Sequence, residues 1–402
     1  MHSLLRRVKA PAVASASPPA PAPMPMLSFP GKKALRFAGD TSAAERDSDL
    51  AVLMHARNHV VVATESAGAA TATEAAAALR AYLRIIYASE LMAGSKQQKL
   101  RFAWRDSSDA GTGTGTAKKK DKDKAAAAQV QEHTSLEAER AVAMFALAGE
   151  LARAAAAVDR RGPEGTRRAC AALSDAAGAL KAAARACGAA DQLCHMTEPC
   201  LATFERLMLA QALECFFERA VAGGKQPAVC SKIARQVSLD YQEVSVKLGS
   251  LQQQQQPIDK SWMPQVQAKA AYFHATASLH YARSLREEGP GSVGEAVARL
   301  RFAVSVLDAA SGKTGPLGKK SPCAAAVRDA AARLRKEVEA ELADAEKDNC
   351  QVYFERVPAA DVLTALPALA SPLVQPTAVE AVLREADGES ALANGGAPTI
   401  RR

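Results

Sequence analysis

Six long segments rich in Ala, Leu and Val follow one another in three pairs, and a short turn of helix-breaking residues joins each pair. The pairs cover residues 139–187, 201–248 and 263–310, so each repeat takes about 45 to 50 residues, as in helical-repeat arrays. One helical hairpin cannot bury its apolar face alone, whereas stacked hairpins bury it in one continuous core. The pattern predicts a mainly α protein, a curved helical solenoid with tetratricopeptide-like helical hairpins.

Small residues must provide most of the packing, because aromatic residues make up only 4% of the chain. Close helix-on-helix contact is therefore favoured over a β-sandwich. A last long helix begins at Ser321–Pro322 and ends at Asn349, a residue type that tolerates the left-handed conformation found after helices. A small β element is expected near Leu100–Trp104, where apolar and polar side chains alternate.

Positive charge is concentrated outside the helical segments. The formal net charge is +8, but the first 39 residues hold six cations and no acid, and residues 118–124 add five Lys against two Asp. The rest of the chain is about neutral and has no aromatic-basic stripe, which argues against nucleic-acid binding. Residues 1–39 are either a disordered basic arm or a transit peptide. We expect the domain at 40–376, a disordered insert at 107–129 and a disordered tail at 377–402.

The sequence contains no convincing catalytic or metal-binding pattern. Its eight cysteines include no CxxC pair. His55 and His59 are spaced like metal ligands on a helix but have no third ligand, and the SGKT turn at 311–314 lacks the earlier glycine of a phosphate loop. We therefore predict free thiols, no metal, no cofactor and no enzymatic activity. No apolar run is long enough to predict a membrane span.

Four stretches, in this order, resemble the Bro-one domain family of Alix, PalA and their relatives. They are LRFAWRDS (100–107), LMLAQALECFFERA (207–220), GEAVARLRFA (294–303), and EKDNCQVYFERVP (346–358) followed by LASPLVQP (369–376). The likeness covers about residues 74–376. Because the chain ends soon after this region, it is similar to the short stand-alone forms found in plants and algae.

The resemblance implies an extended C-terminal return segment, which turns back after the last long helix and lies along the other helices. Asp348–Asn349 would break the helix, Tyr353 and Val357 would anchor the returning chain, and Pro358 would prevent a return to helix. Tyr353 also matches a tyrosine that some family members offer for phosphorylation. A tyrosine that serves only in packing is the alternative.

The function implied by the resemblance is a non-enzymatic adaptor of the ESCRT pathway in endosomal sorting and membrane remodelling. Family members bind the C-terminal amphipathic helix of an ESCRT-III subunit, which lies in a shallow apolar groove. The implied location is cytoplasmic and peripheral on endosomes, where the basic arm could contact anionic lipid. The family's apolar patch falls on Phe216, Val229, Ile233 and Leu373, and its basic positions fall on Arg219 and Arg167.

Helix geometry allows this patch to face outward. Val229 and Ile233 are four residues apart and share a helix face. Phe216 and Phe217 lie about 100° apart around their helix, so one can enter the core while the other faces outward. We therefore expect an accessible notch between two neighbouring helices. Periodicity alone favours a core position for these residues, and the register with the family reverses that preference.

Two other functions remain open at this stage. The first is a related helical scaffold whose patch serves a different peptide, as in pH signalling. The second is an organelle-imported protein unrelated to ESCRT, such as a thiol enzyme, located in a plastid or mitochondrion if residues 1–39 are a transit peptide. The cellular location of a C-terminally tagged protein distinguishes the second from the others.

Overall fold

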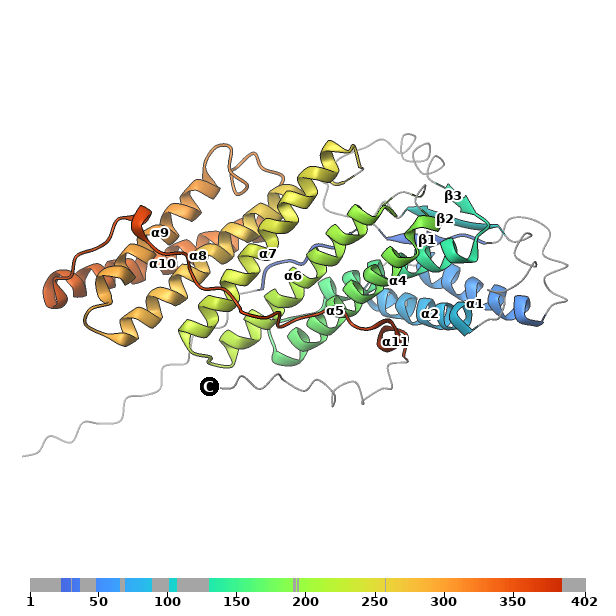
Figure 1. Ribbon diagram of the computed structural model, residues 1–402, viewed down its shortest axis with the longest axis horizontal. Coiled ribbons are helices and arrows are strands. Elements are labelled where there is room, and N and C mark those ends of the chain that lie inside the picture. The colour runs from blue at the N-terminus through green and yellow to red at the C-terminus, as the bar shows by residue number, and fades with distance from the viewer. Residues whose placement is uncertain are drawn as a thin grey trace, which may run out of the picture.

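Long helices stacked side by side make up most of the molecule, and a small sheet lies at one end of the stack (Figure 1). The computed structural model describes residues 23–29, 31–36, 48–65, 69–88, 101–106, 130–190, 193, 195–256 and 258–384. The predicted insert at 107–129 lies outside these residues. The prediction of a mainly α helical solenoid is confirmed.

The three predicted hairpins correspond to α4–α5, α6–α7 and α8–α9. Local signals set their ends: the hydroxyl of Ser135 accepts a hydrogen bond from the amide of Ala138 at the start of α4, and α5, α6 and α7 carry Pro in their first turn. The helices are α1 (Ser48–Glu65), α2 (Ala69–Ala88), α4 (Leu136–Ala157), α5 (Pro163–Arg185), α6 (Glu198–Ala222), α7 (Pro227–Gln253), α8 (Trp262–Glu288), α9 (Val293–Ser311), α10 (Ala325–Asp348) and α11 (Val379–Val382), with 3-10 turns at Cys187–Ala189 and Ala360–Val362.

The sheet has three antiparallel strands in the order β1 (Lys32–Ala34), β2 (Phe102–Asp106) and β3 (Val130–His133). Strand β2 is the predicted β element, shifted by two residues toward the C-terminus. Strands β1 and β3 were not predicted. Lys32 of β1 is buried, and its ammonium group lies 2.6 Å from Asp106 and 2.9 Å from Gln131. The Asp106 carboxylate offsets the buried positive charge of Lys32, and the Gln131 side chain accepts a further hydrogen bond from it.

The N-terminal residues 23–29 and 31–36 belong to the folded unit, although the sequence assigned them to an arm ending at residue 39. Leu27 exchanges two hydrogen bonds with the side-chain amide of Gln211 on α6, at 2.5 and 2.9 Å. Phe29 stacks on Phe204 at 5.1 Å between ring centroids and is 4% exposed. The boundary expected at residue 40 is therefore wrong, and cleavage of a transit peptide after residue 39 would remove part of the core.

A buried ionic cluster joins α1, α2, β2 and α4. The carboxylate of Glu139 forms an ion pair with Arg57 and accepts hydrogen bonds from the Tyr82 hydroxyl and the Trp104 indole, both at 2.7 Å. The side chains of Arg57 and Glu139 are both 0% exposed. Burial acts to raise the pKa of Glu139, but Arg57 and the hydrogen-bond donors outweigh it and leave that pKa below its usual value.

The end of α10 differs from the prediction. Asn349 keeps right-handed helical angles, and a π-helical turn continues from Asn349 to Tyr353. Phe354 instead takes the left-handed conformation, with φ of 52°. The side chain of Asn349 exchanges two 2.9 Å hydrogen bonds with the backbone of Glu355, and this contact reverses the chain. Asn349 thus acts through its amide group and not through a left-handed backbone.

Residues 355–384 form the return segment, which runs from α9 across the middle of the helical stack to α11 (Figure 1). The carboxylate of Glu355 accepts hydrogen bonds from the amides of Gly291 and Gly294 at 2.5 and 2.7 Å. Further along, Arg299 donates to the carbonyl of Thr364, and Arg80 of α2 donates to that of Val382, both at 2.8 Å. The prediction of an extended return segment is confirmed.

The return segment continues past its expected end at residue 376. The amide of Thr377 donates to the carbonyl of Ser174 at 3.1 Å, and Val382 and Leu383 are buried. Residues 377–384, assigned to the tail from the sequence, are therefore part of the fold. Gly178 of α5 makes this contact possible, because a Cβ there would lie 2.1 Å from the Thr377 carbonyl oxygen.

Gly178→Ala is expected to lower the free energy of unfolding by about 1 to 3 kcal/mol, because the added methyl group overpacks this contact. Hydrogen exchange at the Thr377 amide should also become faster. Gly249→Ala on α7 is the control, since its added Cβ meets only the methyl end of Met263 at 3.8 Å. There the better helix propensity of Ala should stabilise the protein or leave it unchanged. Equal effects of the two changes would contradict the role of Gly178.

Candidate functional site

The antiparallel α6–α7 hairpin carries the central predicted site residues, and its register follows from cross-helix ion pairs. Arg206 of α6 lies 2.7 Å from both Asp240 and Glu243 of α7. Counting from these pairs toward the turn at 223–226 places Phe216 level with Ile233 and, one turn further, Arg219 near Val229. Phe216, Val229 and Ile233 therefore all lie near the tip of the hairpin.

The return segment covers the part of this hairpin farther from the turn. Residues 369–374 line a cavity of about 220 Å³ together with Leu209 and Leu213 of α6 and Gln236 and Asp240 of α7. Leu373 is half-buried there and packs against the core. The predicted contribution of Leu373 thus comes from a position further along the hairpin than Phe216.

The two consecutive phenylalanines of α6 point in different directions. Phe217 is 8% exposed and packs edge-on against Phe273 and His280, with ring centroids 5.6 and 5.7 Å away. Phe216 is half-buried, and the guanidinium of the exposed Arg219 lies 5.8 Å from its ring centroid. A cation stacked on a half-exposed ring presents both an apolar surface and a positive charge to a partner.

Val229 and Ile233 differ in exposure although they share a helix face. Val229 is half-buried at the third position of α7, whereas Ile233 is 2% exposed. The expectation that all three patch residues face outward is therefore wrong for Ile233, which is part of the buried core. Ile233 supports the patch from the protein interior.

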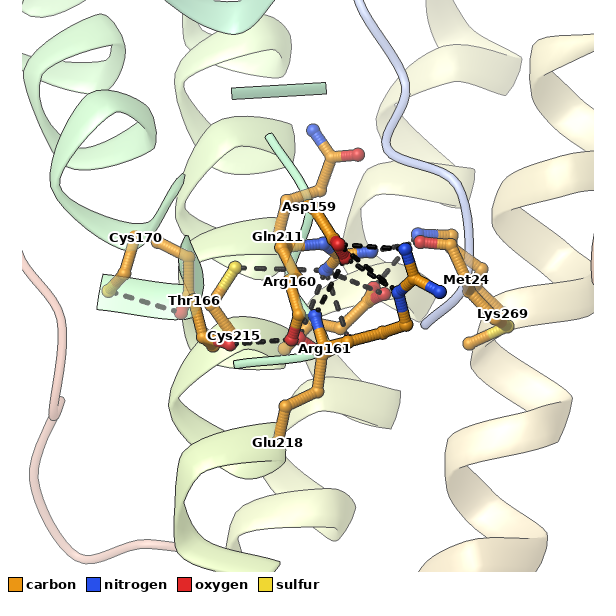
Figure 2. Close-up of polar contacts among 12 residues, drawn as sticks. Met24, Asp159, Arg160, Arg161, Thr166, Cys170, Gln211, Cys215, Glu218 and Lys269 are labelled. Atoms are coloured by element: carbon orange, nitrogen blue, oxygen red, sulfur yellow. Dashed lines mark hydrogen bonds and ion pairs between the residues drawn. The ribbon is translucent and has the colours of Figure 1, made fainter. Parts of the chain in front are cut away.

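Arg167 and Cys170 of α5 border the same region. Arg167 is exposed and forms an ion pair with Glu164 at 3.5 Å. The thiol of Cys170 lies 3.5 Å from the carbonyl of Ala212 on α6, which sets the register of α5 against α6 (Figure 2). In that antiparallel register Arg167 lies about level with Phe216. Arg167 thus adds a second exposed cation at the level of Phe216.

Tyr353, the predicted phosphorylation residue, lies away from this hairpin surface. It is 36% exposed and lines an open hollow that also contains Arg283, Arg286 and Asp348. Val357 is half-buried against the core, so it anchors the return segment more firmly than Tyr353 does. Phosphorylation of Tyr353 stays a prediction.

Four of the described cysteines show little nucleophilic character. Burial raises the pKa of Cys170 to about 11, and burial also raises the pKa values of Cys215, Cys230 and Cys323. Thiols with such pKa values stay protonated at neutral pH. Within the described ranges, no three His, Cys, Asp or Glu side chains are grouped as metal ligands.

Sequence reasoning missed the cavity that residues 369–374 of the return segment form with Leu209 and Leu213 of α6. Leu209 and Leu213 precede Phe216 by seven and three residues, and the helical spacing of these three places them along one stripe of α6. That spacing was visible in the sequence. Their position beneath residues 369–374 depends on a contact between segments about 160 residues apart. Hydrophobic periodicity is a local pattern, so it cannot predict such a contact.

The chain matches known proteins in sequence and in fold. It is 33% identical to vacuolar-sorting protein BRO1 of Arabidopsis thaliana over 239 residues, 58% of this chain and 27% of that protein. It is also 33% identical to pH-response regulator protein palA/RIM20 of Emericella nidulans over 227 residues, 55% of this chain and 25% of that protein. The chain thus spans about a quarter of the length of these two relatives.

A solved complex of the ALIX BRO1 domain with CHMP4C shares the fold, with a TM-score of 0.67 and 20% sequence identity over 88% of this chain and 95% of that chain. No described helix offers an apolar stretch of the length that crossing a bilayer requires. The model of the BRO1-like domain matches residues 32–394, which includes β1 and the whole return segment. This chain belongs to the BRO1-like domain family.

Proposed function

We propose that this protein is a non-enzymatic adaptor that binds the C-terminal amphipathic helix of an ESCRT-III subunit in endosomal sorting. The observation that carries the proposal is the surface at the tip of the α6–α7 hairpin. Phe216 and Val229 are half-buried there, Arg219 is exposed beside the ring of Phe216, and Arg167 is an exposed cation on the neighbouring α5. An amphipathic helix with acidic residues beside its apolar face would match that surface.

The family relationship supports the same function. The Arabidopsis relative is a vacuolar-sorting protein, and the similar ALIX domain was solved together with CHMP4C, an ESCRT-III subunit. The raised pKa of Cys170 gives no support to the alternative of a thiol enzyme at that residue. A location in the cytoplasm, peripheral to endosomal membranes, fits this function.

Val229→Asp is expected to weaken binding of an ESCRT-III C-terminal helix by at least about tenfold, because the carboxylate must lose water against the apolar face of that helix and would repel the acidic residues beside it. The folded state should tolerate this change. Residue 229 is the third position of α7, where a negative charge interacts favourably with the helix dipole. Calorimetric titration of the full chain with the peptide, combined with thermal unfolding, measures both quantities.

Val246→Asp is the matched control, since Val246 lies on the same helix, is 71% exposed and is remote from the hairpin tip. It should leave the affinity unchanged. Ile233→Asp is a poorer test, because it would place a charge in the core and unfold the protein. Wild-type protein that binds no ESCRT-III helix, or Val229→Asp protein that binds as tightly as wild type, would refute the site.

A pH-signalling scaffold is the second candidate function, and the similarity to palA/RIM20 favours it. Both functions use a peptide-binding helical domain, so the partner distinguishes them. Affinity purification that recovers ESCRT-III subunits supports the first function. Recovery of pH-signalling components without ESCRT-III subunits supports the second.

A further inference from the structure

Two exposed histidines on α1 bring their ring nitrogens close together. The Nε2 atom of His55 lies 3.1 Å from the Nε2 atom of His59, and the ring centroids are 4.6 Å apart. Two nitrogen atoms that each lie about 2.0 to 2.1 Å from one zinc ion are about 3.3 to 3.4 Å apart in a tetrahedral site. The two rings are therefore already spaced almost as a pair of ligands to one metal ion, and both are open to solvent.

The described part of the chain gives this pair no third ligand. Among the described residues, His, Cys, Asp and Glu side chains form no group of three that could hold a metal ion. Zinc in a closed protein site is held by four ligands, so His55 and His59 supply half of such a set. A site shared by two copies of the chain needs only two ligands from each copy.

The surface around the histidine pair suits a second copy of the same chain. Val52 and Val62 are 53% and 61% exposed, and helical spacing places them on the same stripe of α1 as the two histidines. The stripe reads Val, His, His, Val at residues 52, 55, 59 and 62, which is symmetric about residue 57. A two-fold axis at that level would bring the two histidine pairs together and place Val52 of each copy against Val62 of the other.

The opposite face of α1 is fixed in the core. Leu53, Arg57 and Val60 on that face are 0 to 1% exposed. The helix lies at the end of the stack that carries the sheet, apart from the tip of the α6–α7 hairpin (Figure 1). The histidine stripe is therefore a rigid outward surface, separate from the surface proposed to bind the ESCRT-III helix.

The stripe is too small to hold two copies together without a metal ion. From Val52 to Val62 it extends about 15 Å along the helix. Stable interfaces between proteins bury about 1,200 to 2,000 Å² in total, which two valines from each copy do not approach. Metal coordination must therefore provide most of the affinity, so association should depend on the ion.

We infer that His55 and His59 form a zinc site that assembles between two copies of this chain, with four imidazoles around one ion. Imidazole nitrogen is a preferred ligand of zinc, and zinc accepts tetrahedral coordination without redox chemistry. Each ring binds through Nε2 and keeps its proton on Nδ1. The ion thus replaces the contact between the two rings of one copy and links them to the rings of the other.

Sedimentation velocity of the full chain with and without zinc tests this inference. Zinc should double the mass in solution at one ion per two chains, and a chelator should reverse the change. His59→Ala should bind zinc at least about tenfold more weakly, because two linked ligands bind more tightly than one, and it should not associate. Cys350→Ser removes an exposed thiol elsewhere and should behave as the wild type does.

Cobalt(II) reports the geometry of the site. Four-coordinate cobalt absorbs visible light strongly, whereas six-coordinate cobalt with water ligands absorbs weakly. The wild-type chain should therefore give strong absorption bands with cobalt, and His59→Ala should lack them. Zinc that binds one ion to each chain without association, or association that persists in His59→Ala, would overturn the proposal.

Val62→Lys tests the two-fold arrangement. The ammonium group does not bind zinc, and a cation near the C-terminal end of α1 interacts favourably with the helix dipole, so the fold should tolerate it. The dissociation constant of the zinc-bound dimer should rise at least about tenfold, because the ammonium group would lose water against Val52 of the other copy. Val246→Lys makes the same exchange at a 71% exposed position of α7 and should have no effect. Equal dissociation constants for the two lysine variants would contradict the arrangement.

Discussion

Glu139→Ala is expected to lower the free energy of unfolding by about 3 to 5 kcal/mol, as removal of one partner of a buried ion pair does. The change would leave the fully buried Arg57 without its carboxylate and the Tyr82 hydroxyl and Trp104 indole without their acceptor. Domains of this kind have a total stability of about 5 to 15 kcal/mol. The variant should therefore be partly unfolded at moderate temperature, which urea titration followed by circular dichroism can measure.

Glu137→Ala is the matched control for this prediction. Glu137 lies in the same first turn of α4, so both changes remove a favourable interaction with the helix dipole. Its side chain is 57% exposed and only 4.0 Å from Arg140, so its removal should cost at most about 1 kcal/mol. If Glu139→Ala costs no more than Glu137→Ala, the cluster around Glu139 does not hold the sheet to the helices.

Glu214→Leu is expected to have an effect of similar size, about 3 to 5 kcal/mol. It would leave Lys269, whose side chain is 0% exposed, without its carboxylate and would remove the hydrogen-bond acceptor of Tyr241. Because Glu214 joins α6 to α7 and α8 in the middle of the stack, the loss should appear as a lower midpoint of the whole unfolding transition.

The double variant Glu214→Leu/Lys269→Met separates the missing ion pair from other damage. Replacing both partners by apolar side chains of similar length removes the buried unpaired ammonium group. It should recover at least about 2 kcal/mol of the loss, although Tyr241 still lacks its acceptor. A double variant no more stable than the single variant would mean that Lys269 is not the source of the instability.

The sequence was sufficient to predict the hairpins, because apolar periodicity and Gly or Pro turns are local signals. It was not sufficient for β1, whose partner β2 begins about 70 residues later, and the Pro-rich surroundings of residues 23–29 concealed their burial. The end of the return segment was misplaced for a similar reason. Its last anchor, Val382, meets Arg80 and Gly178 far away in the chain.

The candidate site shows a different limit of sequence reasoning. Periodicity shows that Val229 and Ile233 share a face, but it does not show how much of that face a neighbouring helix covers. In the structure Ile233 is buried, whereas Val229, one turn nearer the start of α7, is half-buried. For Phe216 and Phe217, helix geometry showed that the rings must diverge. The structure showed that Phe217 enters the core.

A stack of hairpins in which each touches only its neighbours would unzip from its ends, one repeat at a time. Here a single stretch of backbone is tied to α9 through Thr364 and to α2 through Val382. Neither α2 nor α9 can separate from the stack without breaking its hydrogen bond to this stretch, which is also bound to the other of the two helices. The hairpins therefore cannot unfold independently of one another, and thermal unfolding should be cooperative, as in a globular domain.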